Sequence, residues 1–328
     1  MIFPGRSSRV ARVALWTLGL CFVVCVAAFV SGAGLHAAPR ASNAHSLAPQ
    51  QQPIRVEVDL VSILASVVDK SNRPIIDLPK DAFQIYDEGK LQNITLFEAE
   101  THQPIDLALM MDASMSTALD FTTERDAAAR FFQKVVRPND GVSFFTFSDD
   151  VIQKTNFTDD VPKLQQALRN VKEGAGTALY DAVVLGSQEL AKRKSERRRV
   201  IVIVTDAGET TSHASFDMAR REAIRSDALL YTIILNPVKG ESGRNTAGEH
   251  ALQTITEVTG GAMFYPASAA QLDGIYGRID RELRTQYRLG FYPDPKPPAG
   301  ELRHIEVHVK GDYTVRYRQA YIAPGAAK

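Results

Sequence analysis

Cysteine is scarce in this chain of 328 residues: there are two, Cys21 and Cys25, and both fall within one apolar segment near the amino terminus. The remaining sequence has none, which excludes a disulfide framework and cysteine-based metal sites there. An excess of one charge is also absent, because 38 Lys and Arg residues balance 38 Asp and Glu residues. This balance gives no global indication of a nucleic-acid partner, and we expect none.

Long hydrophobic runs are absent except for one, Val13–Val30, which carries no charged residue. Arg6, Arg9 and Arg12 precede it, and small residues follow it. A positive start, an apolar centre and small residues predict that residues 1–38 are a secretory signal peptide. With 18 residues, the run also has the length to remain as a membrane anchor. We therefore expect a secreted, periplasmic or cell-envelope protein that is held at the membrane only if this segment is not cleaved.

The sequence pattern changes again after this segment. Residues 39–53 are polar and rich in Pro, Gln and Ala, which predicts a linker. Residues 54–100 alternate between apolar and polar positions and predict a small β unit with a hairpin turn at Gly89. Residues 287–322 alternate in the same way, and we expect them to pair with the first β unit to form one discontinuous β domain.

Residues 103–286 have a different pattern, in which short apolar runs bounded by turn residues alternate with helical periods. Runs such as VIVIV within RRVIVIVTD are wholly apolar, which is typical of parallel strands that are buried on both faces. Helices must then cover both faces of the sheet. The predicted fold class is α/β, with a doubly wound, mostly parallel, Rossmann-like sheet beside the smaller β domain. In such sheets, ligands bind beyond the carboxyl ends of the strands.

Small oxygen-bearing side chains follow these apolar runs where the strands are expected to end. Asp112 ends the first run and precedes Ser114 and Ser116, Thr177 opens a helix after a Gly-Ala-Gly turn, and Asp206 ends a later run. The set has two carboxylates and three hydroxyls, and no His or Cys. Oxygen ligands alone favour a hard cation, Mg²⁺ first, with Mn²⁺ or Ca²⁺ as alternatives. Neutral hydroxyl ligands would leave such a cation open to a further carboxylate.

The pattern Asp112-x-Ser114-x-Ser116, Thr177 within GTALYDAV, and Asp206 after an apolar strand resembles the metal-ion-dependent adhesion site of von Willebrand factor A domains. The resemblance implies that the two serines bind the metal directly, the threonine directly or through water, and the two aspartates largely through water. It also implies a protein partner that supplies an Asp or Glu carboxylate as the last ligand. The flanking strands resemble a bacterial secreted subgroup of these proteins.

One residue departs from the family pattern, because Ala207 follows the last aspartate where the family usually has glycine. A methyl group there could crowd the metal loop, which leaves open a structural envelope protein with a degenerate metal site. A Mg²⁺-dependent hydrolase at the same edge is a further alternative, since carboxylates and a metal can activate water. The sequence offers no general base or third acid there, so we expect a binding module and not an enzyme. The Ser and Asp residues could also simply cap the helices that follow them.

A basic cluster from Lys192 to Arg199 is the densest group of charges in the chain. It falls at the end of an expected helix, where positive charge is favourable, and we expect it to be a solvated turn. An anionic partner, such as a lipid or a polysaccharide, is the alternative. His304 and His308 share one face of an expected strand, but no third ligand accompanies them, so they are expected to face solvent.

Overall fold

The computed structural model describes residues 60–99, 103–117, 121–194, 196–235 and 245–324, except for the side chain of Ser116. The expected signal segment and the linker that follows it lie outside the described residues. Within the described residues, no helix is both long and apolar enough to cross a membrane. All described elements belong to one compact unit, Arg55–Lys328.

A six-stranded sheet in the order β10-β9-β8-β5-β6-β7 lies at the centre of the fold. Its strands are β5 (Ile105–Asp112), β6 (Gly141–Phe147), β7 (Val151–Gln153), β8 (Arg198–Thr205), β9 (Ala228–Ile234) and β10 (Met263–Phe264). Neighbouring strands are parallel, except that β7 pairs antiparallel with β6 at one edge. Every residue of β5, β6 and β9 is buried. The predicted α/β class with a mostly parallel sheet is confirmed.

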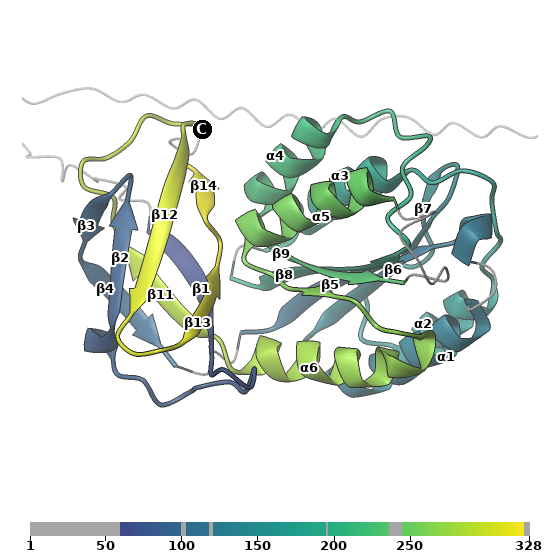
Figure 1. Ribbon diagram of the computed structural model, residues 1–328, viewed down its shortest axis with the longest axis horizontal. Coiled ribbons are helices and arrows are strands. Elements are labelled where there is room, and N and C mark those ends of the chain that lie inside the picture. Colours follow the sequence, from purple (N-terminus) through teal and green to yellow (C-terminus); the bar gives the residue numbers. More distant parts are fainter. Residues whose placement is uncertain (1–59, 100–102, 118–120, 195, 236–244, 325–328) are drawn as a thin grey trace, which may run out of the picture. The chain divides into compact units, whose positions relative to one another are not determined.

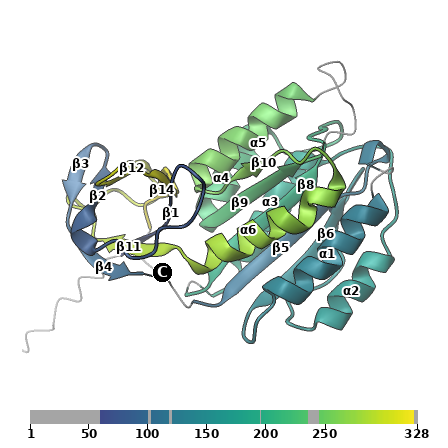
Figure 2. The same cartoon turned by 60° about the horizontal axis from the view of Figure 1, so that its bottom comes forward.

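Helices cover both faces of this sheet, with α3, α4 and α5 on one face and α1, α2 and α6 on the other (Figures 1 and 2). The helices are α1 (Phe121–Val135), α2 (Val161–Arg169), α3 (Leu179–Ala191), α4 (Phe216–Ser226), α5 (Thr246–Thr259) and α6 (Leu272–Arg284). Short 3-10 turns are η1 (Lys80–Ala82), η2 (Met115–Thr117) and η3 (Ala269–Gln271). Two helix starts are set locally: Asp160 caps α2 and Ser215 caps α4, each by accepting a backbone hydrogen bond.

The two sides of each central strand belong to two different hydrophobic cores. Leu107 and Leu109 of β5 pack in a cluster with residues of α1, α2 and α6. Ala108 and Met110 of the same strand pack in a cluster with residues of α3, α4 and α5. Successive side chains of a strand point to opposite faces, so an apolar residue is needed at every position. This is why the strands appear in the sequence as continuous apolar runs.

The segments before and after the α/β domain form two four-stranded sheets, in the orders β13-β1-β11-β4 and β14-β12-β2-β3. The strands are β1 (Val61–Val68), β2 (Phe83–Asp87), β3 (Lys90–Gln92), β4 (Ile94–Glu98), β11 (Tyr287–Phe291), β12 (Leu302–Val309), β13 (Thr314–Tyr317) and β14 (Ala320–Ile322). Each sheet combines strands from both ends of the described chain. Buried side chains such as Ile63, Ile85 and Tyr287 form a third hydrophobic cluster in this part of the protein.

The prediction of a solvated basic turn is wrong for its arginines. Arg193 and Arg197 both form ion pairs with Asp106, at 2.9 and 2.7 Å, and the side chain of Asp106 is fully buried. Arg198 is 2% exposed. A buried carboxylate at the start of β5 needs cationic partners, and the segment between α3 and β8 supplies them. Local charge density in the sequence does not reveal such a partner, because Asp106 lies about 90 residues earlier.

Candidate functional site

The carboxyl ends of β5 and β8 lie side by side at one edge of the sheet. The two strands are parallel, and their register pairs Met111 with Val204. The next residues, Asp112 and Thr205, therefore occupy corresponding positions at the ends of the two strands. The chain continues from these ends into the loops that carry Ser114 and Asp206. This is the edge at which open α/β sheets bind ligands.

Asp112 is fully buried, and both of its carboxylate oxygens are engaged. Oδ1 accepts a hydrogen bond of 2.9 Å from the backbone N–H of Ser114. Oδ2 accepts one of 2.6 Å from the hydroxyl of Thr205. Burial raises the pKa of Asp112 to about 6, against the lowering effect of these hydrogen bonds, and the negative charge of Asp206 adds to the rise. A nearby cation would favour the ionised form.

The loop after β5 turns immediately into η2, which fixes the backbone around Ser114. The hydroxyl of Thr117 donates to the carbonyl oxygens of Asp112 and Ser114, at 3.2 and 2.9 Å. Ser114 is buried and forms a parallel β-bridge with Gly174, whose N–H donates to the carbonyl of Ala113. The backbone of Ser116 lies in η2, but its side chain is outside what the structure describes.

The Gly-Ala-Gly turn that precedes Thr177 is held by an acidic side chain from the loop after β6. The carboxylate of Asp149 accepts hydrogen bonds from the backbone N–H groups of Ala175 and Gly176, at 2.9 and 2.8 Å. Thr177 donates its own N–H to the hydroxyl of Thr210 at 2.8 Å. Within the described residues, the hydroxyl of Thr177 has no hydrogen-bond partner. That oxygen is therefore available to a ligand.

Side-chain oxygens of Asp206 and Thr177 both lie close to Gly208. Oδ1 of Asp206 accepts a hydrogen bond of 2.9 Å from the N–H of Gly208. A Cβ atom on Gly208 would lie 3.1 Å from Oδ1 of Asp206 and 3.2 Å from Oγ1 of Thr177. The two oxygens thus border the same small space, which a glycine keeps open. Both residues are buried, at 7% and 4% exposure.

Ala207, the departure from the family pattern, occupies a different environment. Its backbone has φ of 64°, the left-handed region that favours glycine. Its methyl group is buried in the hydrophobic cluster formed with α3, α4 and α5. Its carbonyl faces Gly248 so closely that a Cβ on Gly248 would lie 2.0 Å from the oxygen. The position at which an added Cβ would crowd the two site oxygens is Gly208 and not Ala207.

The structure brings four of the five predicted residues together at one edge: Asp112, Ser114, Thr177 and Asp206. Their donor atoms are all oxygens, which suits a hard cation such as Mg²⁺. In the described part of the chain, no group of three or more His, Cys, Asp or Glu side chains could hold a metal ion. The candidate set differs from such groups, because it combines two carboxylates with hydroxyls.

Three further residues contribute to this edge and were not singled out from the sequence. Thr205 orients Asp112, Asp149 holds the turn before Thr177, and Gly208 leaves room beside Asp206. Thr205 and Gly208 each lie within two positions of Asp206, so adjacency in sequence offered a signal for both. Asp149 lies in a run of polar residues after β6, and nothing in the local pattern distinguishes it from Asp150.

A family model described as von Willebrand factor type A domain matches residues 107–209. The matched segment contains every predicted site residue. No curated protein matches the chain by sequence.

Solved structures provide more distant similarities. A von Willebrand factor type A protein from Catenulispora acidiphila is 9% identical, with 74% of this chain and 72% of that chain covered and a TM-score of 0.49. The conserved hypothetical protein BatB from Bacteroides thetaiotaomicron is 15% identical over 55% of this chain and 100% of that one, with a TM-score of 0.44. The vWF domain of the type V pili tip protein Mfa5 from Porphyromonas gingivalis is 11% identical, with coverages of 56% and 96% and a TM-score of 0.46.

Proposed function

Since this chain contains a von Willebrand factor type A domain, we propose that it is a metal-dependent protein-binding module of the adhesion type. The observation that carries the proposal is the gathering of Asp112, Ser114, Thr177 and Asp206 at the carboxyl edge of the sheet, with the Thr177 hydroxyl unpartnered within the described residues. A divalent cation, Mg²⁺ first and Mn²⁺ or Ca²⁺ as alternatives, would supply a positive centre for a carboxylate of the partner.

The roles of the residues follow from their contacts. Ser114, Ser116 and Thr177 would hold the cation through neutral hydroxyls, while Asp112 and Asp206 supply negative charge. Because both oxygens of Asp112 already accept hydrogen bonds, this side chain is suited to act through water. Only two acidic charges would offset the cation, so it would retain affinity for an Asp or Glu side chain of another protein.

The surroundings of the site favour binding over catalysis. The engaged oxygens of Asp112 leave it poorly placed to take a proton from water, which a hydrolase at this edge would require. Met115, between the two serines, is 69% exposed. An exposed, flexible apolar side chain beside a charged centre is suited to contact a protein surface. We therefore propose that the chain is not an enzyme.

The place of action follows from the first residues of the sequence. The arginines and the apolar run before the linker support export, and the site would then act in the periplasm, at the cell envelope or outside the cell. A protein that presents an acidic side chain is the proposed partner, and contact with the membrane would be made only through the apolar run.

A calorimetric titration of the full chain, purified in mild detergent, with Mg²⁺, Mn²⁺ and Ca²⁺ tests the proposal. We expect one saturable site in the wild type, and no binding by Asp112→Ala. The matched control is Asp159→Ala, which removes an exposed acid from the loop before α2 and should leave metal affinity unchanged. Equal metal binding by wild type and Asp112→Ala would show that the site is wrongly assigned. Metal-dependent turnover of an ester or phosphoester panel would instead favour the hydrolase.

A further inference from the structure

A groove with a volume of about 330 Å³ lies between α4 and the neighbouring strands β12 and β14. Cavities of about 300 Å³ or more commonly hold small organic ligands. None of the residues that line the groove belongs to the loops around Asp112, Thr177 or Asp206. The groove is therefore separate from the proposed metal site and needs no bound cation.

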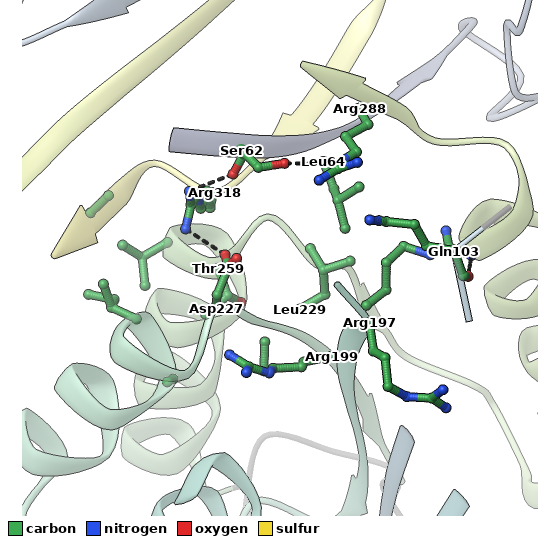
Figure 3. Close-up of a pocket in the computed structure, with 16 residues that line it drawn as sticks. Ser62, Leu64, Gln103, Arg197, Arg199, Asp227, Leu229, Thr259, Arg288 and Arg318 are labelled. Carbon is green, nitrogen blue, oxygen red and sulfur yellow. Dashed lines mark hydrogen bonds and ion pairs between the residues drawn. The ribbon is translucent and has the colours of Figure 1, made fainter. Parts of the chain in front are cut away.

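The two walls of the groove are joined by Arg318, which lies between β13 and β14. Its guanidinium donates to a carboxylate oxygen of Asp227, the residue that ends α4, and to the carbonyl oxygen of Ser62 in β1 (Figure 3). The turn at Gly300, on the other wall, is closed by a hydrogen bond from its N–H to the carbonyl oxygen of Ala323. These contacts fix α4 relative to the β sheet, so the groove is preformed.

The floor and one wall of the groove are apolar. Ile224 of α4 is 7% exposed, which places it at the floor. Leu302 and Ile322 are direct partners in neighbouring strands, so their side chains lie on the same face of the sheet and form the wall. Leu302 is 45% exposed. A ligand with an apolar body would remove this surface from water, which is favourable.

The helical wall of the groove carries positive charge. Arg220, Arg221 and Arg225 all line it, because side chains three or four positions apart on a helix share a face. Arg220 forms an ion pair with Asp217 at 3.4 Å, and Arg225 forms one with Glu222 at 3.3 Å. Arg221 is exposed and forms no ion pair within the described residues. Together, these five side chains carry one net positive charge.

We propose that this groove binds a small apolar carboxylate, that is, a molecule with one carboxylate group and a hydrocarbon body. The planar guanidinium fork of Arg221 matches the two oxygens of the carboxylate, and the hydrocarbon body covers Ile224 and Leu302. The methylene groups of the arginines add apolar surface to the groove. One carboxylate balances the single net charge, whereas a doubly charged phosphate ester would exceed it.

The two ion pairs on α4 do not prevent such binding. The side chains of Arg220 and Arg225 are 43% and 59% exposed. Exposed ion pairs contribute little to stability, so these guanidinium groups can turn towards the ligand at small cost. Arg221 has no such pair to lose, which makes it the principal partner of the carboxylate.

Equilibrium dialysis of the full chain against radiolabelled octanoate tests the proposal. An equal detergent concentration on both sides cancels partition into micelles, and EDTA removes divalent metal, so the result is independent of the metal site. We expect saturable binding at one site. Each methylene group removed from water contributes up to about fourfold in affinity, so unlabelled butyrate should compete at least about tenfold less well than octanoate. Octanol, which lacks the charge, should also compete at least about tenfold less well.

Two variants separate the contribution of the charge from that of the apolar wall. Loss of one charge-assisted contact weakens binding about tenfold or more, so Arg221→Gln should lower octanoate affinity by at least that factor. Leu302→Ser should lower it several-fold, because less apolar surface is covered. The matched controls are Arg169→Gln, at the end of α2, and Leu91→Ser, in β3, which replace exposed residues outside the groove. Circular dichroism establishes that all four variants are folded.

Each outcome decides the proposal. Losses in both groove variants, with both controls at wild-type affinity, support it. Absence of saturable octanoate binding by the wild type overturns it, as does full affinity in Arg221→Gln or Leu302→Ser. Equal loss in either control indicates general attraction to charge or to apolar surface and also overturns it. Octanol or butyrate that competes as strongly as octanoate contradicts recognition of a carboxylate with an apolar body.

Discussion

The hydroxyl of Thr205 donates a hydrogen bond of 2.6 Å to Oδ2 of Asp112, and so links the ends of β8 and β5. The same hydroxyl accepts the backbone N–H of Ala207 at 3.0 Å. Thr205 thereby fixes the direction of the Asp112 carboxylate and also the start of the loop that carries Asp206. One side chain that is not a proposed metal ligand positions two that are.

Replacing Thr205 with Val should weaken Mg²⁺ binding. A hydrogen bond to a charged group contributes about 1.5–3 kcal/mol, so its loss should lower metal affinity by roughly tenfold or more if Asp112 must be ionised and oriented. Thr205→Ser keeps the hydroxyl and should stay close to the wild type. Calorimetric titration with Mg²⁺ measures both variants. Unchanged affinity in Thr205→Val, in a folded protein, would show that the orientation of Asp112 does not matter for metal binding.

Gly208→Ala should reduce metal affinity more than any change at Ala207. The added Cβ would lie 3.1 Å from Asp206 Oδ1 and 3.2 Å from Thr177 Oγ1, which is tight enough to separate the two oxygens. Ala207→Gly should leave affinity unchanged, because the methyl group lies in a hydrophobic cluster. The two variants are compared by Mg²⁺ titration after circular dichroism has established that both are folded. A gain of affinity in Ala207→Gly would instead support the degenerate-site hypothesis.

Ionisation of Asp112 should make the metal-free protein less stable as the pH rises from about 4 to about 6. Its pKa is raised from 3.8 to about 6 by burial, so the folded state holds this proton more tightly than the unfolded state. That contribution is fully present below pH 3.8 and is lost as the pH rises through 6, with a total of about 3 kcal/mol. Asn cannot ionise, so the Asp112→Asn variant should lack this loss. Urea unfolding in EDTA should show its free energy of unfolding rising relative to that of the wild type by this amount between pH 4 and 7. A difference that does not change with pH would contradict the assignment.

Asp106→Ala should destabilise the fold strongly. The carboxylate is fully buried and pairs with Arg193 and Arg197, so its removal leaves cations without a partner at a cost of about 3–5 kcal/mol. The control is Asp273→Ala, which removes an acid from an exposed pair with Arg130 and should cost less than about 1 kcal/mol. Urea unfolding at neutral pH measures both. Similar small losses in the two variants would mean that the basic cluster is solvated after all.

The sequence by itself determined the α/β core of this protein and the order of its candidate ligands. Strands buried on both faces need apolar residues at every position, so β5 and β8 appear as unbroken runs. Polar residues directly after such runs lie at one edge of a parallel sheet, so the sequence alone predicts that Asp112 and Asp206 lie at the same edge. These features depend on a few consecutive residues, so the sequence alone is enough to predict them.

Only the tertiary structure decided the features that join distant parts of the chain. The pairing of β1 with both β11 and β13 links residues more than 200 positions apart. Nothing in the local sequence divides the eight flanking strands between two separate sheets. The arginines after α3 turn inward because Asp106 lies buried beneath them. Their charge density alone would predict that they face solvent. The strength of charge and hydrogen-bond interactions depends on the distance between atoms and on burial, and the fold sets both.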